Sequence, residues 1–134
     1  MNKLINAARH IPVDEPVSTI SITPVMLDAA GRPKPIEMRI TAPMQGRNLP
    51  IILLSHGHGP SLYIPSKDGY GPLANFYAEH GFVVIQPTHG NSKVAGFDMD
   101  APGAPFFWRS RVEDFKLILD HLKDIETASP VLDG

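Results

Sequence analysis

An unbroken apolar run that ends in a glycine-containing loop constrains the fold of this chain more than any other feature. Residues 49–55 read Leu-Pro-Ile-Ile-Leu-Leu-Ser, and His56-Gly57-His58-Gly59 follows directly. Continuous apolar residues, several of them β-branched, are typical of a strand buried on both faces of a parallel sheet. Glycines let the backbone approach a ligand closely, and α/β proteins bind ligands at the carboxyl ends of their strands. We therefore expect a central strand with a functional loop at its end.

A second apolar strand follows this loop after one helix. A proline near its start and Gly81 at its end suit a helix over residues 71–81. Residues 82–86 form a second strand whose first four side chains are apolar, so the order strand, helix, strand predicts a right-handed parallel crossover. We expect four side chains of this helix to share the face that lies on the sheet: Leu73, Phe76, Tyr77 and His80.

The remaining segments complete an α/β architecture. Residues 17–23 and 36–42 alternate apolar with polar side chains around a turn-forming connector, which predicts an antiparallel pair at the edge of the sheet. Residues 1–16 contain two prolines and little periodicity, so we expect an irregular arm followed by one domain over 17–134. A capping-box spacing at Ser110 predicts a second covering helix, which can also begin a turn earlier. Its apolar stripe is Val112, Phe115, Ile118, Leu119, Leu122 and Ile125.

Composition excludes several classes of function. The 134 residues carry a net charge of -2 and no basic stripe, which disfavours nucleic acid as a partner. The absence of cysteine excludes disulfides, thiolate metal sites and a cysteine nucleophile. The first residues contain no sustained apolar stretch, so we expect no signal peptide, no membrane span and a cytoplasmic location. We expect no cofactor.

The glycine-containing loop has three interpretations. In α/β serine hydrolases, one backbone N–H of the oxyanion hole comes from the loop after the third strand, and His58 occupies that position. A plain glycine turn between a strand and a helix explains the same spacing. A metal site would use His56 and His58 as ligands, with His89, Asp98 and Asp100 as candidates for the rest, but two alternate histidines are a weak signal.

The chain contains no serine nucleophile in a recognisable motif. The segment nearest to Gly-x-Ser-x-Gly is Gly90-Asn91-Ser92-Lys93-Val94, which lacks the second glycine and precedes no helix. The arginines that flank Ser110 could clamp an anion, although arginines at a helix start are more often solvated or paired with acids. His89 follows a strand at its carboxyl end and could line a pocket, although this position favours a histidine whose hydrogen bonds are satisfied by loop backbone.

Four segments in the same order give the chain a family resemblance. They read Leu-Leu-Ser-His-Gly-His-Gly over 53–59, Tyr-Gly-Pro-Leu-Ala-Asn-Phe over 70–76, His-Gly-Phe-Val-Val-Ile-Gln-Pro-Thr-His over 80–89 and Trp-Arg-Ser-Arg-Val-Glu-Asp-Phe over 108–115. Together they resemble the amino-terminal part of α/β-hydrolases of the dienelactone hydrolase, chlorophyllase and platelet-activating-factor acetylhydrolase type. The resemblance implies a partial α/β-hydrolase fold and a serine esterase that acts on small-molecule carboxylic esters.

The resemblance also assigns roles to individual residues. It implies that His58 supplies the oxyanion-hole N–H and that His56 and Gly57 shape this loop. It also implies that Gly57 and Gly59 lie against the substrate, and that Tyr63 and His89 border the acyl pocket. The family places its nucleophile strand, acid and histidine base later than residue 134. We therefore expect this truncated chain to be inactive alone and to need a complementing carboxyl-terminal chain. The alternative is a non-catalytic module that binds a partner or itself through an exposed strand edge.

Overall fold

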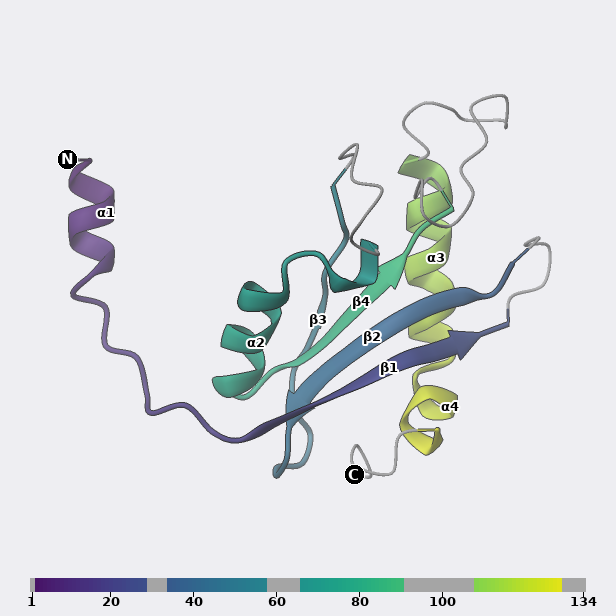
Figure 1. The fold of residues 1–134 in the computed structure, drawn as a ribbon, viewed down its shortest axis with the longest axis horizontal. Coiled ribbons are helices and arrows are strands. Elements are labelled where there is room, and N and C mark those ends of the chain that lie inside the picture. Colours follow the sequence, from purple (N-terminus) through teal and green to yellow (C-terminus); the bar gives the residue numbers. More distant parts are fainter. Residues whose placement is uncertain (1, 29–33, 58–65, 91–107, 129–134) are drawn as a thin grey trace.

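The computed structural model describes residues 2–28, 34–57, 66–90 and 108–128, and these form a mixed four-stranded sheet with helices on both faces (Figure 1). The strands are β1 (Thr19–Leu27), β2 (Ile36–Pro43), β3 (Ile51–Leu53) and β4 (Val83–Thr88), in the spatial order β1-β2-β4-β3. The helices are α1 (Lys3–Ala8), the 3-10 turn η1 (Ser66–Asp68), α2 (Gly71–Glu79), α3 (Trp108–Asp120) and α4 (Leu122–Thr127).

The relative directions of the strands agree with those expected from the sequence. β1 and β2 are antiparallel, and β3 runs parallel to β4 with Ile51 opposite Val83, which confirms the parallel crossover through α2. β2 and β4 are antiparallel, so the sheet is mixed. β1 continues past the expected end at residue 23, because proline is tolerated in an edge strand; the register shifts between Ile22 and Val25.

The expectation of a central β3 buried on both faces is wrong. Within the described residues β3 is the outermost strand beside β4, and Ile51 is 39% exposed. The next three residues, Ile52, Leu53 and Leu54, are only partly buried. A strand that pairs with a neighbour on one side only leaves its other edge open. The apolar side chains of β3 are therefore more exposed than its sequence predicts.

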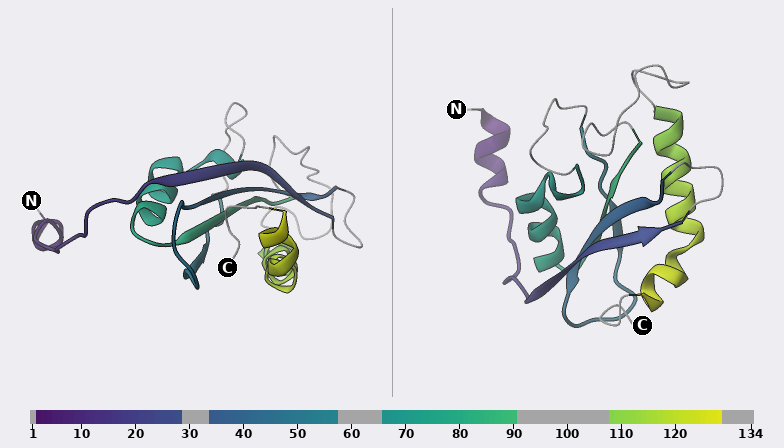
Figure 2. Two further views of the ribbon diagram at one scale, coloured as in Figure 1. Left: turned by 90° about the horizontal axis from the view of Figure 1, so that it is seen from below. Right: turned by 45° about the vertical axis from the view of Figure 1, so that its right-hand side comes forward.

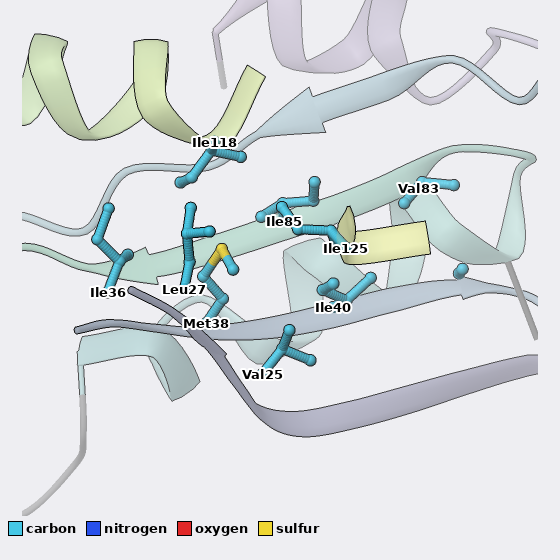
Figure 3. Close-up of a cluster of buried hydrophobic side chains, with 10 residues drawn as sticks. Val25, Leu27, Ile36, Met38, Ile40, Val83, Ile85, Ile118 and Ile125 are labelled. Atoms are coloured by element: carbon cyan, nitrogen blue, oxygen red, sulfur yellow. The ribbon is translucent and has the colours of Figure 1, made fainter. Parts of the chain in front are cut away.

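One face of the sheet packs against α3 and α4 (Figures 2 and 3). Ile118 of α3 and Ile125 of α4 lie over a cluster of buried strand residues, and Figure 3 shows their side chains converging on it. Alternate residues of β2 face this core because side chains of a strand alternate between its two faces. The buried strand residues of the cluster are Val25, Leu27, Ile36, Met38, Ile40, Ala42, Val83 and Ile85.

The opposite face is covered by α2, and here the expected helix face is only partly correct, since Tyr77 and His80 are partly buried but Leu73 and Phe76 are not. Ala74 and Ala78 are the buried residues of α2, whereas Leu73 and Phe76 are 40% and 45% exposed. Alanines let a helix lie close to a sheet, and a close helix turns the larger side chains outward. The ends of α2 were predicted correctly: the helix begins at Gly71, and Gly81 has a φ of 94° just beyond its end.

The stripe expected on the second covering helix is also only partly correct. Ile118 and Ile125 are buried, but Val112 and Leu119 are exposed, and the buried acid Asp114 faces the sheet instead. α3 already includes Trp108, so Ser110 lies inside the helix and does not cap it. The arm over 1–16 contains one element that was not expected, α1, which has no buried residues and stands apart from the sheet in Figure 1.

Candidate functional site

Three elements bring polar side chains to one end of the sheet. Ser55, His56 and Gly57 follow β3, and His89 follows β4, because parallel neighbouring strands place their carboxyl ends together. The first turns of α3 add Arg111 and Asp114 from the core face. We call the set Ser55, His56, His89, Arg111 and Asp114 the polar network.

A line of hydrogen bonds runs from Ser55 through His89 to Asp114. The Ser55 hydroxyl lies 3.0 Å from Nε2 of His89, and Nδ1 of His89 lies 2.7 Å from Oδ2 of Asp114. The carboxylate accepts the Nδ1–H, so a neutral His89 leaves Nε2 to accept the hydroxyl proton. These connections are those of a serine, histidine and acid triad.

The surroundings of Ser55, His89 and Asp114 suit a structural hydrogen-bond network better than a catalytic triad. His89 and Asp114 are each only 1% exposed, and the His89 ring lies between the rings of His56 and Phe115, at centroid distances of 5.1 and 5.3 Å. Arg111 Nη1 donates to the Ser55 oxygen at 2.9 Å and so occupies one of its two lone pairs and makes it less nucleophilic. A base that shuttles protons needs access to the leaving group, which this burial denies.

His56 is held by hydrogen bonds at both ring nitrogens. Its Nε2 accepts the backbone N–H of His89 at 3.1 Å, and its Nδ1–H donates to the carbonyl of Gly57 at 2.8 Å. This pattern assigns the neutral tautomer with the proton on Nδ1. His56 would have to give up one of these bonds to bind a metal ion.

Arg111 connects α3 to the loop after β3. Nη1 donates to the carbonyl of His56 at 2.5 Å as well as to Ser55, and Nη2 reaches the carbonyl of Gly57 at 3.4 Å. Burial lowers the pKa of the Arg111 guanidinium, while the charge of Asp114 and the nearby Tyr70 act in the opposite direction. The guanidinium therefore fixes the positions of three consecutive residues.

The residues proposed from the sequence are only partly within the described structure. His58, Gly59 and Tyr63, together with the candidate ligands Asp98 and Asp100, lie outside the described residues. Gly57 is exposed, and a Cβ placed on it would lie 3.1 Å from the hydroxyl oxygen of Tyr70, so only glycine fits without displacement. His89 is brought to the site, but its ring is buried. In the described ranges, no three His, Asp or Glu side chains gather as metal ligands.

Sequence reasoning missed the roles of Ser55, Arg111 and Asp114. The sequence favours an arginine that is solvated or paired with nearby acids, whereas the Arg111 guanidinium donates to two backbone carbonyls and a hydroxyl. A signal existed: Arg111, Asp114 and Ile118 recur at spacings of three and four and so share a helix face with a buried core residue. Polar residues on an apolar helix face need partners in the interior.

The chain is partly similar to a curated protein. The chain is 32% identical over 97 residues to chlorophyllase-1 of Arabidopsis thaliana, which covers 71% of this chain and 28% of that protein. No protein-family model matches the chain. The match supports a hydrolase-like relationship. The four-stranded sheet with its helices is compatible with a partial α/β fold. The chain spans less than a third of the length of this relative.

No helix in the described ranges is both long and apolar enough to cross a membrane.

Proposed function

We propose that this chain is the amino-terminal part of a serine hydrolase of small-molecule carboxylic esters, related to the dienelactone hydrolase, chlorophyllase and platelet-activating-factor acetylhydrolase group. In this proposal the loop after β3 supplies the oxyanion-hole N–H through His58, and His56 and Gly57 shape that loop. Gly57 and Gly59 lie against the substrate, and Tyr63 and His89 lie near the acyl pocket. The observation that carries it is the rigid attachment of Ser55, His56 and Gly57 to α3 through Arg111. Fixed donors stabilise a developing oxyanion without reorganising.

The 134 residues alone are proposed to be inactive. Acyl transfer needs an activated nucleophile, and the sequence contains no Gly-x-Ser-x-Gly elbow. Ser55 is a poor substitute because its oxygen accepts a hydrogen bond from Arg111 and its histidine partner is buried. The isolated chain therefore supplies one part of the catalytic apparatus.

Turnover of a short-chain p-nitrophenyl ester tests this function. We expect the pure chain to hydrolyse the ester no faster than buffer. Co-expression with the polypeptide encoded after the Gly134 codon, provided that it carries a Gly-x-Ser-x-Gly elbow, should give hydrolysis that a serine-directed phosphonate abolishes. Phosphonate-sensitive turnover by the 134 residues alone would contradict the proposed division of the active site.

A second candidate function is self-association through β3. Leu54 N–H donates to Ile85 and the carbonyl of Pro50 accepts from Val83, so the alternate residues Ile51 and Leu53 direct their backbone groups away from β4. An apolar strand with an open edge is a template for another strand.

Light scattering separates the two candidates. Self-association predicts a dimer or larger species that Ile51→Lys converts to a monomer, whereas Leu119→Lys, an equally drastic change at an exposed site on α3, leaves it intact. A wild-type monomer that unfolds cooperatively would rule out self-association through this edge.

A further inference from the structure

We propose that His80 is a pH-sensitive tether: its protonated ring holds the amino-terminal arm, residues 2–16, against the end of α2, and its neutral ring releases the arm. The proposal starts from the partners of the two ring nitrogens. Nδ1 lies 2.7 Å from the carbonyl oxygen of Phe76, and Nε2 lies 3.1 Å from the carbonyl oxygen of Asp14. Phe76 belongs to α2 and Asp14 to the arm, so one side chain joins the two segments.

Both partners of the His80 ring are hydrogen-bond acceptors. A carbonyl oxygen can only accept, so each ring nitrogen must carry a proton to make its bond. A neutral imidazole has a proton on one nitrogen, and its other nitrogen would turn a lone pair toward a carbonyl oxygen. The imidazolium donates from both. His56 has a different arrangement, since one of its nitrogens accepts the N–H of His89 and the neutral ring satisfies both bonds.

The end of α2 leaves the Phe76 carbonyl without its usual helical donor. In a continuing helix the backbone N–H of His80 would donate to Phe76, but it donates to the carbonyl of Tyr77 at 3.1 Å instead. The His80 ring replaces this bond. Carbonyls at the carboxyl end of a helix carry partial negative charge, so they interact more favourably with a charged imidazolium than with a neutral ring.

The remaining surroundings of the ring also favour its charged form. The His80 and Phe76 rings lie 4.4 Å apart between centroids, within the range at which an aromatic ring attracts a cation. The titratable side chains next to the contact along the chain are acids: Asp14 and Glu15 on the arm, and Glu79 on α2. Above about pH 5 these carboxylates are ionised, and their charges favour the imidazolium.

The contact with Asp14 decides how much of the arm lies on the domain. The Val17 N–H donates to the carbonyl of Glu79 at 2.9 Å, so the chain is attached from residue 17 onward without help from His80. Every residue from 2 to 16 is exposed, including those of α1, which stands apart from the sheet in Figure 1. Burial therefore does not hold the arm in place, and a single hydrogen bond has a large effect on its position.

Protonation of His80 should close the tether, and its loss should open it. A histidine side chain changes its charge between about pH 5 and pH 8. At the lower end of this range both bonds form. As the pH rises the ring keeps one proton, and it keeps the shorter bond to Phe76, which lies within the same helix end. The bond to Asp14 is then lost, and the arm is released as far as Pro16.

Nuclear magnetic resonance of the full 134-residue chain at pH 5.5 and pH 8.0 tests the tether. We expect the carbonyl carbon shift of Asp14 to follow the titration of the His80 ring, and the backbone of residues 11–15 to be more mobile at pH 8.0 by nitrogen relaxation. The protection factor of the Val17 amide corrects for the effect of pH on intrinsic exchange. It should be about tenfold higher at pH 5.5, because a hydrogen bond from a charged donor holds the adjacent chain.

Two variants separate the tether from a general effect of pH. His80→Gln cannot become a double donor toward both carbonyls, so the pH dependence of the arm should disappear. His121→Gln is the matched control: His121 also lies just beyond a helix and contacts the carbonyl of Leu117, four residues earlier, at 2.8 Å. Because it follows α3, on the opposite face of the sheet from α2, this variant should keep the pH dependence of the wild type.

An Asp14 carbonyl shift that stays constant while the His80 ring titrates would overturn the proposal. So would arm relaxation that is equal at both pH values, or a pH dependence that persists in His80→Gln. If His80→Gln does not fold, the wild-type titration decides alone, since it requires no variant. None of these measurements depends on ester hydrolysis, so the tether and the proposed catalytic function can fail separately.

Discussion

Nδ1 of His89 and Oδ2 of Asp114 lie 2.7 Å apart, and the two side chains are almost completely buried between β4 and α3. A hydrogen bond to an ionised group is stronger than one between neutral groups, and removing one buried partner leaves the other unsatisfied. This pair connects α3 to the carboxyl end of β4, where the polar network lies.

Asp114→Asn should therefore lower the free energy of unfolding by about 1.5 to 3 kcal/mol. The amide keeps the shape of the side chain but loses the charge that both His89 and Arg111 face. Urea denaturation monitored by circular dichroism measures the change, and Asp120→Asn on the exposed side of the same helix is the control, with an expected effect below about 0.5 kcal/mol. Equal free energies of unfolding for the two variants would show that the His89–Asp114 pair does not stabilise the fold.

Ser55 should not react with a fluorophosphonate probe. Its oxygen accepts a hydrogen bond from Arg111, and the ring of its partner His89 is buried and hydrogen-bonded to Asp114, away from any leaving group. Intact mass spectrometry of the treated protein should show no added mass in the wild type or in Ser55→Ala. An adduct that forms on the wild type and is absent from Ser55→Ala would make Ser55 a nucleophile and the polar network a catalytic triad.

The packing of α2 predicts an unusual order of mutational effects. Ala78→Leu places a large side chain where α2 contacts the sheet and should lower the free energy of unfolding by about 1 to 3 kcal/mol through overpacking. Leu73→Ala removes a partly exposed side chain and should cost less than about 1 kcal/mol. Thermal and urea unfolding measure both values. A larger loss of stability from Leu73→Ala than from Ala78→Leu would support the helix face expected from the sequence.

An ionic cluster that joins two residues of η1 to Arg39 of β2 should make the stability of the fold depend on pH. Arg39 and Lys67 lie 2.9 and 3.1 Å from the two oxygens of Asp68. Burial alone would raise the pKa of Asp68, but hydrogen bonds from Arg39 and Lys67 outweigh it and hold the pKa below its ordinary value of 3.8. The ionised carboxylate therefore stabilises the fold above that value, and the stabilisation is lost as the pH falls through the lower pKa of the folded state.

Asp68→Asn tests this dependence. At pH 7 we expect the variant to be less stable than the wild type by about 1 kcal/mol, and the difference should disappear as the pH falls below about 4. Urea denaturation from pH 7 down to pH 2.5 measures both curves. Glu113→Gln, which breaks the exposed pair with Lys116, should cause little change at pH 7. A difference that persists undiminished at the lowest pH would contradict a role for the Asp68 charge.

Local features of the chain were predictable because they depend on neighbouring residues. The alternation over 36–42, the helix ended by Gly81 and the crossover from β3 to β4 all follow from short-range pattern and chain geometry. The burial of β3 could not be read in the same way. Its apolar sequence predicts that both faces of the strand are shielded from water, but it does not predict which strand lies beside it.

Tertiary structure alone decided which residues meet at the candidate site. The sequence determined that a glycine-containing loop follows a strand, and that a helix carrying Arg111 and Asp114 comes later. It did not determine that Arg111 contacts the carbonyl of His56 or that Asp114 binds His89, because these pairs are 55 and 25 residues apart. Such contacts depend on how α3 crosses the sheet. They also depend on which side chains of α2 and α3 face the sheet, and these include small alanines in α2 and the polar Asp114 in α3.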